Sequence, residues 1–189
     1  MDLVQALAPA TEVPQVHQVR KRSSTGEEDP RLKIIVYGEP GAQGSKRFLR
    51  TTATGKGIMV ENSAKVEPWR QDVKQAAEAV LESLGRPSPF QGAVMVRMVF
   101  TFLRPTSVKR AKRPYPSVTP DLSKLCRSTE DALTSAGVWR DDALVTEYVR
   151  LAKVYANEDP DALDRSGALI VILPVVATLE LTGSPPLKE

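Results

Sequence analysis

Cysteine and histidine are nearly absent from this chain of 189 residues, which contains one of each, Cys126 and His17. A lone cysteine cannot form a disulfide within the chain, and no Cys/His zinc pattern exists. His17 lies in a weakly patterned stretch, which argues against histidine-based catalysis. This composition favours a reducing compartment.

Long apolar runs are also missing. No window approaches the eighteen or so apolar residues that a membrane-spanning helix requires. The first residues lack the basic start and the apolar segment of a signal peptide. We therefore expect no membrane partner and a cytoplasmic location, in a bacterial host if the chain is phage-encoded.

Charge is unevenly distributed, although the net charge is only +3. From Arg97 to Arg127 the only acidic residue is Asp121, while basic residues recur. A local positive field of this kind is typical of a surface that binds a polyanion.

Hydrophobic patterning predicts one domain over residues 31–176, with a disordered tail at 1–30 and another tail at 177–189. Within it, 32–37 is a β-branched strand, and 48–52 with 57–60 forms a hairpin. Asn62 or Ser63 caps a helix that runs to Leu84. Its apolar side chains recur at gaps of three and four, so they form one buried face: Val66, Trp69, Val73, Ala76, Ala77, Val80, Leu81 and Leu84.

The segment GEPGAQGSKR, residues 38–47, follows the first strand. Its glycines allow close backbone approach, and Lys46 and Arg47 add donors that suit phosphate. The spacing is not that of a P-loop. Both a phosphate-contacting loop and an ordinary glycine turn fit this segment.

A central strand is predicted over 93–103, followed by a loop at 104–120 whose prolines exclude a helix or a central strand. The loop is dense in cations and is followed directly by Asp121, which favours contact with nucleic acid over a merely solvated loop. The cations predicted to bind DNA here are Arg104, Lys109, Arg110, Lys112 and Arg113.

The next helix is predicted over 121–136, with Thr119 as cap, Pro120 in the first turn and Gly137 as terminator. Its buried face contains Leu122, Leu125, Cys126, Thr129, Ala132 and Leu133, so Cys126 is a core residue and not a nucleophile. Its flank carries Asp121, Lys124, Arg127, Ser128 and Asp131.

A long alternating strand over 143–156 places Glu147 and Lys153 on one face. The acidic segment NEDPDALDRSG is predicted to be a solvated loop, since it lacks calcium-binding spacing. A buried strand at 168–175 completes the domain. The predicted fold is α/β, a mixed β-sheet covered by two main helices.

Carboxylates without histidine or cysteine suit a hard cation, Mg²⁺ or Mn²⁺. The candidate ligands are Asp121, Asp142 and Asp141, and Lys124 or Arg127 could stabilise charge on a phosphate. Each acid also has an ordinary interpretation, because Asp121 begins a helix and Asp141-Asp142 precedes a strand. A helix from Asp121 to Ser135 is roughly 22 Å long, which separates Asp121 from Asp142. We therefore expect a C2 homodimer whose two chains complete each site.

The chain resembles the RusA family of Holliday junction resolvases, which is common in phages. The resemblance rests on TPDLSKLCRSTEDALTSAGVWRDDALV (119–145), on Lys153-Val-Tyr155, and on YGEPGAQGSKR (37–47). It implies a RusA-like fold and a Mg²⁺-dependent homodimeric endonuclease that binds four-way or branched DNA and makes paired symmetric nicks in recombination and repair.

The family motif P-D-x-D-[NK]-L falls on residues 120–125. The resemblance makes Asp121 the first acid, Asp142 the third, Lys124 the Asn/Lys position and Arg127 the helix cation. Ser123 stands where the family has its second Asp, and a hydroxyl is a poorer ligand than a carboxylate. Two further hypotheses therefore stay open: a junction-binding protein with impaired or absent cleavage, and a basic α/β interaction domain with no DNA role.

Overall fold

The computed structural model describes residues 31–44, 47–51, 57–60, 64–86 and 89–175. The predicted tails at 1–30 and 177–189 lie outside these ranges. The predicted caps Asn62 and Ser63 also lie outside them, and that prediction was wrong because the N-cap of the first long helix is Lys65.

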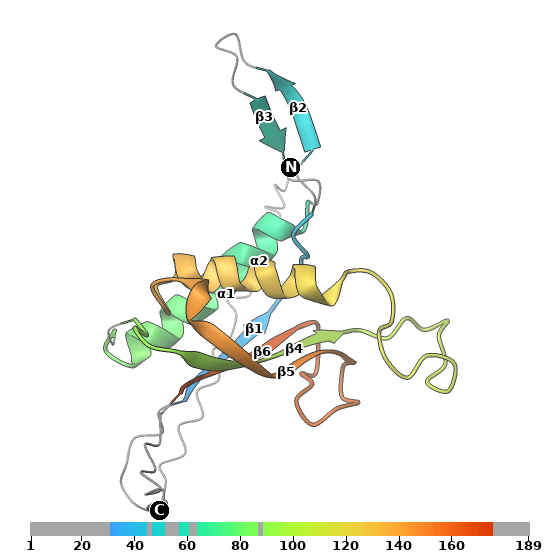
Figure 1. Ribbon diagram of the computed structural model, residues 1–189. Helices are drawn as coiled ribbons and strands as arrows, with labels where there is room; N and C mark the ends of the chain where they lie inside the picture. The colour runs from blue at the N-terminus through green and yellow to red at the C-terminus, as the bar shows by residue number, and fades with distance from the viewer. Residues whose placement is uncertain (1–30, 45–46, 52–56, 61–63, 87–88, 176–189) are drawn as a thin grey trace, which may run out of the picture.

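The main sheet has four strands in the order β1 (Leu32–Tyr37), β6 (Gly167–Pro174), β4 (Val94–Phe102) and β5 (Val145–Tyr155). β6 runs antiparallel to both β1 and β4, whereas β5 runs parallel to β4. The sheet is mixed and β4 is interior, which confirms the predicted fold class and the central position of that strand (Figure 1).

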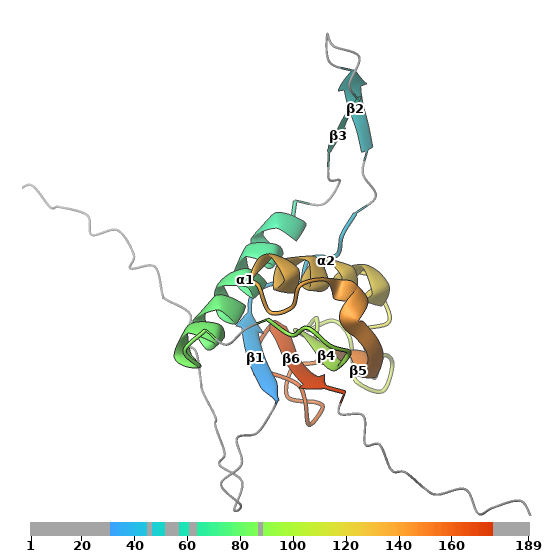
Figure 2. The ribbon, with the colours of Figure 1, turned by 60° about the vertical axis from the view of Figure 1, so that its left-hand side comes forward.

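Two helices, α1 (Val66–Ser83) and α2 (Leu122–Ser135), cover one face of this sheet (Figures 1 and 2). Their apolar faces join the side chains of β1, β4 and β6 in one core. The apolar face predicted for α1 is confirmed. Its buried or partly buried members are Val66, Trp69, Val73, Ala76, Ala77, Val80, Leu81 and Leu84.

Trp69 lies at the centre of this core and is fully buried. Its ring packs at 57° against Phe100 of β4, with the ring centroids 6.3 Å apart. Its indole N–H donates to Thr129 Oγ1 of α2 at 3.0 Å, so the one polar atom of the ring has a partner. The prediction that Trp69 is a core residue is confirmed.

The segment after β1 packs against both helices. A Cβ on Gly41 would lie 2.1 Å from the backbone oxygen of Lys65, so only glycine allows this approach to the start of α1. The carbonyl oxygen of Gly41 accepts from Ser128 Oγ at 2.6 Å, and the N–H of Gln43 donates to the carbonyl oxygen of Lys124 at 3.0 Å. Gly41 therefore has a packing role, and the phosphate-contact prediction for the rest of the segment stays open.

The predicted N-cap of α2 was wrong by two residues. Its N-cap is Asp121 rather than Thr119, and Pro120 lies before the helix. Ser128, which was predicted to lie on the flank of the helix beside its buried face, is itself fully buried beneath Gly41. The predicted C-terminal boundary is confirmed, with Ala136 as C-cap and Gly137 at a φ of +77°.

β5 starts later than predicted, because a 3₁₀ turn over Asp142–Leu144 precedes it. Two bulges interrupt its pairing with β4, so Glu147 pairs with Met95 whereas Lys153 pairs with Phe100. Met95 and Phe100 point to opposite faces of β4. Glu147 and Lys153 therefore lie on opposite faces. The prediction that they share one was wrong because one of the two bulges, between Tyr148 and Arg150, adds a single unpaired residue between them.

The acidic segment between β5 and β6 is not a purely solvated loop. It lies across the sheet face opposite the helices (Figure 1), where Asp161 pairs with Arg97 at 3.2 Å and with Arg150 at 2.5 Å. Asp159 also pairs with Arg150, at 2.6 Å, and these hydrogen bonds lower the pKa of Asp159. These ion pairs hold the loop against the sheet.

A second, two-stranded sheet contains β2 (Arg47–Thr51) and β3 (Gly57–Val60). The strands are antiparallel, with a register shift between Phe48 and Arg50. The predicted hairpin is confirmed, with β2 beginning one residue earlier than expected.

Cys126 gives a direct test of the core. The side chain is 5% exposed, and burial raises the pKa of its thiol to about 12. A raised pKa keeps the thiol protonated at pH 8, and the thiol is not the nucleophilic form. We expect an aromatic disulfide reagent at pH 8 to label the folded protein far more slowly than the protein in guanidinium chloride. Rapid stoichiometric labelling of the folded protein would contradict this burial.

Candidate nuclease site and its cationic loop

The basic loop, residues 104–120, connects β4 to α2 and contains no regular helix or strand, as predicted. Both of its ends are anchored. At its second end, Lys153 Nζ of β5 donates to the carbonyl oxygens of Val118 at 2.6 Å and Pro120 at 2.8 Å. Burial lowers the pKa of Lys153, while the negative charge of Asp121 opposes that change. Lys153 thus joins the loop, the start of α2 and the edge strand.

Arg104 anchors the first end of the loop. Its Nε and Nη2 donate to the two carboxylate oxygens of Glu158 at 2.6 and 2.7 Å, and Nη1 donates to the carbonyl oxygen of Arg113 at 2.7 Å. Its guanidinium carbon lies 3.8 Å from the ring centroid of Tyr155. The predicted phosphate contact of Arg104 remains untested, but in this structure its donors are used to hold the loop.

Glu158 was missed as a functional residue because it lies in the segment predicted to be solvated. Hydrogen bonding from Arg104 lowers the pKa of its carboxyl group, so it stays ionised as the partner of that guanidinium. The long separation of the two residues in the chain gives no local pattern from which this pairing could be predicted.

The remaining cations of the loop are exposed, except for Arg113, which lines a pocket under the loop. Lys109, Arg110 and Lys112 are exposed, and Arg113 is half-buried. Arg110 approaches Glu158 at 3.4 Å, but its own side chain is 73% exposed. An exposed pair of this kind contributes at most about 1 kcal/mol, so it leaves Arg110 available to a polyanion.

Asp121 stands where the basic loop enters α2. Its carboxylate pairs with Lys124 at 3.1 Å, in an exposed i,i+3 pair that contributes about 0.5 kcal/mol or less. Ser123 and Arg127 are exposed on the same helix. The structure therefore places four predicted site residues on one accessible helix surface beside the loop.

Asp141 and Asp142 lie at the start of β5. Asp141 is exposed, and its Oδ1 accepts from the N–H of Ala143 at 2.8 Å, which makes it the cap of the 3₁₀ turn. Asp142 is exposed and close enough to Glu130 of α2 to raise the pKa of that carboxyl group.

Glu130 is a second residue that the sequence did not reveal. It is largely buried and accepts a hydrogen bond from the hydroxyl of Tyr148. Burial is the main cause that raises its pKa, and the hydrogen bond from Tyr148 opposes the rise. An acid in the middle of an amphipathic helix is usually exposed, so periodicity alone could not identify it.

These contacts show that α2 runs antiparallel to β5. Asp121 interacts with Lys153 near the end of β5, whereas Glu130 contacts Tyr148 near its beginning. Val145 and Lys153 are eight residues apart, which is roughly 25 Å along a strand. Asp121 and Asp142 therefore lie toward opposite ends of the helix and strand, as the helix length predicted.

One chain does not assemble a metal centre from these acids. Among the described residues, no group of three or more His, Cys, Asp or Glu side chains is placed to hold a metal ion. Asp121, Asp141 and Asp142 are thus not brought together within a single copy. The remaining predicted DNA contacts cannot be placed in full, since Lys46 lies outside the described residues and only the backbone of Arg47 is described.

The family model described as "Endodeoxyribonuclease RusA" matches residues 38–162. This segment contains the basic loop, α2 and all of β5, and it is about two thirds of the chain. The chain therefore belongs to the RusA endodeoxyribonuclease family. No curated protein matches it significantly.

Membership supports the activity of an endodeoxyribonuclease of the Holliday junction resolvase type that acts on branched DNA. Nucleases of this family are generally dependent on a divalent metal, and among the described residues of one chain no three acids are placed to hold one. In the part of the chain that the structure describes, no helix is long and apolar enough to cross a membrane.

The anchoring role of Arg104 can be tested by hydrogen exchange. Arg104→Ala removes both the bidentate pair with Glu158 and the guanidinium stacked on Tyr155. Backbone amides of residues 105–118 should therefore exchange several-fold faster than in the parent protein. The matched control is Arg110→Ala, which removes only the exposed partner of the same carboxylate. Equal exchange in the two variants would show that Arg104 does not hold the loop.

Proposed function

We propose that this protein is a Mg²⁺-dependent endonuclease that binds four-way DNA junctions as a homodimer and resolves them by paired symmetric nicks. The observation that carries the proposal is the position of Asp121, at an exposed helix start beside the cationic loop, within the segment that matches the RusA family. Oxygen ligands without histidine or cysteine favour Mg²⁺, with Mn²⁺ as the alternative ion.

The dimer is supported by the separation of the two acids. A two-fold axis perpendicular to α2 and β5 would reverse the direction of both elements in the second copy. Because Asp121 and Asp142 lie toward opposite ends of α2 and β5, this reversal turns Asp142 of one chain toward Asp121 of the partner subunit. Each site then takes one acid from each chain.

The edge strand β5 offers a surface for that contact. In the four-stranded sheet its second edge is unpaired, and Tyr148 and Val149 are large side chains that are 40% and 48% exposed. An edge strand with exposed apolar side chains is a ready surface for another copy. Two symmetric sites also suit a substrate that needs two matched cuts.

DNA contact is proposed for the cations around the first acid. The exposed members of the basic loop and Lys124 face the solvent side of Asp121, so phosphate binding there would lead the strand toward the carboxylate. The residues proposed to take part are Lys46, Arg47, Arg104, Lys109, Arg110, Lys112, Arg113, Lys124 and Arg127. The location that fits this role is the bacterial cytoplasm.

The second candidate function is junction binding with impaired cleavage, and Ser123 favours it. Two acids that could replace the missing carboxylate are poorly placed for this. Asp141 caps its own turn, and Glu147 lies on the sheet face opposite Lys153. Asp121 and Asp142 would then be the two predicted ligands left at each composite site, which predicts weak metal binding and slow cleavage.

Nicking of a synthetic four-way junction in Mg²⁺ tests the activity and the role of Ser123 together. We expect Asp121→Asn to reduce nicking to background while junction binding persists. Ser123→Asp should raise the rate by about tenfold, which corresponds to about 1.4 kcal/mol of transition-state stabilisation. Ser123→Asn introduces a side chain with the shape of aspartate but without its charge, and it is the matched control.

Two results would count against parts of this proposal. No gain with Ser123→Asp would show that the serine does not limit cleavage. Junction binding no tighter than duplex binding would favour an interaction domain without a DNA role.

Mixing two inactive variants tests the composite site. In a dimer of one Asp121→Asn chain and one Asp142→Asn chain, one site receives both altered acids and the other receives both natural acids. We expect the mixture to regain nicking on one strand only, from the roughly half of dimers that are mixed after exchange. Persistent inactivity of the mixture, with exchange confirmed by tagged chains, would place both acids of a site in the same chain.

A further inference from the structure

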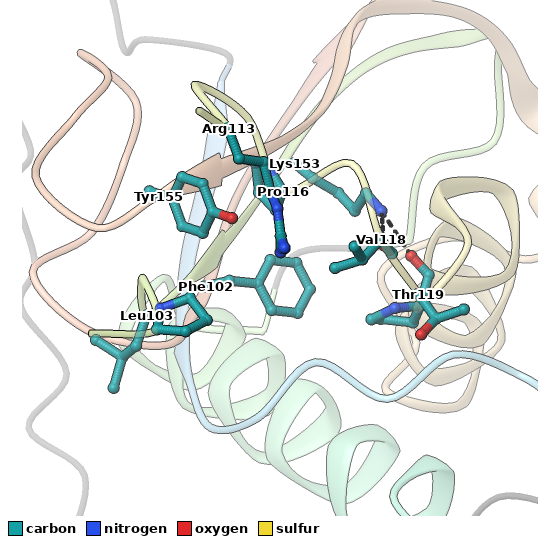
Figure 3. Close-up of a pocket in the computed structure, with 10 residues that line it drawn as sticks. Phe102, Leu103, Arg113, Pro116, Val118, Thr119, Lys153 and Tyr155 are labelled. Atoms are coloured by element: carbon teal, nitrogen blue, oxygen red, sulfur yellow. Dashed lines mark hydrogen bonds between the residues drawn. The ribbon is translucent and has the colours of Figure 1, made fainter. Parts of the chain in front are cut away.

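A small pocket lies under the basic loop, between the loop and the ends of β4 and β5 (Figure 3). Its volume is about 100 Å³. Phe102, Pro116 and Val118 contribute apolar walls, and Tyr155 and Lys153 of β5 also line it. The pocket opens beside Thr119 and Pro120, immediately before Asp121, so whatever occupies it lies next to the candidate site.

Tyr155 has a polar group that its own chain does not satisfy. The side chain is only 3% exposed, and among the described residues its hydroxyl has no hydrogen-bond partner. A buried hydroxyl without a partner destabilises a fold, so such a group needs an explanation. In Figure 3 the hydroxyl points into the space that Phe102 borders.

The neighbours of Tyr155 hold this group in place without satisfying it. The guanidinium of Arg104 stacks on the ring at 3.8 Å, and its N–H groups are directed to Glu158 and to carbonyl oxygens of the loop. Lys153 Nζ donates to the carbonyl oxygens of Val118 and Pro120. The hydroxyl is therefore left on a rigid wall, as a donor or acceptor for a molecule that enters the pocket.

The chemistry of the pocket matches one nucleotide. Apolar walls and a fixed hydroxyl suit the ring and the polar edge of a base, and Arg113 and Lys153 add positive charge to the lining. The exposed Lys109, Arg110 and Lys112 on the basic loop suit the flanking phosphates.

We propose that the pocket receives one unstacked base from the branch point of a DNA junction, with the Tyr155 hydroxyl hydrogen-bonded to the edge of that base. This inference rests on the proposed function, since it assumes a branched DNA substrate. A branch point is where a base leaves the stack at the lowest cost, because its stacking is already interrupted. Insertion of that base would position the neighbouring phosphate beside Asp121.

The test measures binding to four-way junctions by fluorescence anisotropy without a divalent metal. Single abasic nucleotides are placed in turn at each position around the branch. We expect the parent protein to bind one of these abasic junctions about tenfold more weakly than the intact junction, as loss of one stacked base predicts. Abasic sites within the arms should have little effect.

The variant Tyr155→Phe removes only the hydroxyl. It should bind the intact junction several-fold more weakly and the sensitive abasic junction as the parent does, while its melting temperature stays equal or rises because an unsatisfied group is gone. The matched control is Tyr115→Phe, since Tyr115 lies on the basic loop and its side chain is 67% exposed. That variant should bind both junctions as the parent does.

The outcomes separate the two proposals. Tight junction binding with no sensitive abasic position, or an unchanged ratio between intact and abasic junctions in Tyr155→Phe, overturns the pocket inference alone. Loss of affinity for both junctions equally would mean that the hydroxyl serves the fold or a partner chain, which also overturns it. Failure of the parent protein to prefer junctions over duplex overturns the proposed function and this inference with it.

Discussion

The two-pronged hydrogen bond between Arg104 and Glu158 is the contact on which the candidate site depends. The basic loop contains four prolines, and its own backbone hydrogen bonds are short-range turns, so side chains are needed to fix its position on the sheet. Arg104 supplies this at one end and Lys153 at the other. The same two residues enclose Tyr155, shape the pocket and direct the outer cations of the loop to solvent. Arg104 and Lys153 can therefore act by positioning other residues of the basic loop.

The opposed directions of α2 and β5 set a second constraint. Asp121 lies at the start of α2 and Asp142 lies just before β5, so a single copy holds these two acids toward opposite ends of the paired elements. Glu130 and Tyr148 lock the helix against the strand near the Asp142 end. Rearrangement within one chain would have to break this buried contact, whereas association of two chains leaves it intact.

Local patterns predicted most of the fold. The apolar faces of α1 and α2, the interior strand β4 and the glycine that ends α2 all follow from spacing and turn chemistry. The errors have one physical origin, which is contact between distant segments. Ser128 is buried by Gly41, Asp161 is paired by Arg97, and the bulges of β5 depend on its alignment with β4. Glu130 and the Tyr155 pocket were missed for the same reason, because their partners come from other elements.

The charged side chains fall into two classes that differ in their sensitivity to ionic strength. One class is the ion pairs on the sheet face opposite the helices, and the other is the exposed cations of the basic loop. Asp159 and Asp161 are 16–18% exposed beside Arg150, so mobile ions screen them weakly. The exposed lysines and arginines of the basic loop are fully subject to screening, with a Debye length of about 10 Å at 0.1 M salt. Rising salt should thus detach a bound polyanion well before it loosens the sheet, which leaves a folded protein able to bind again.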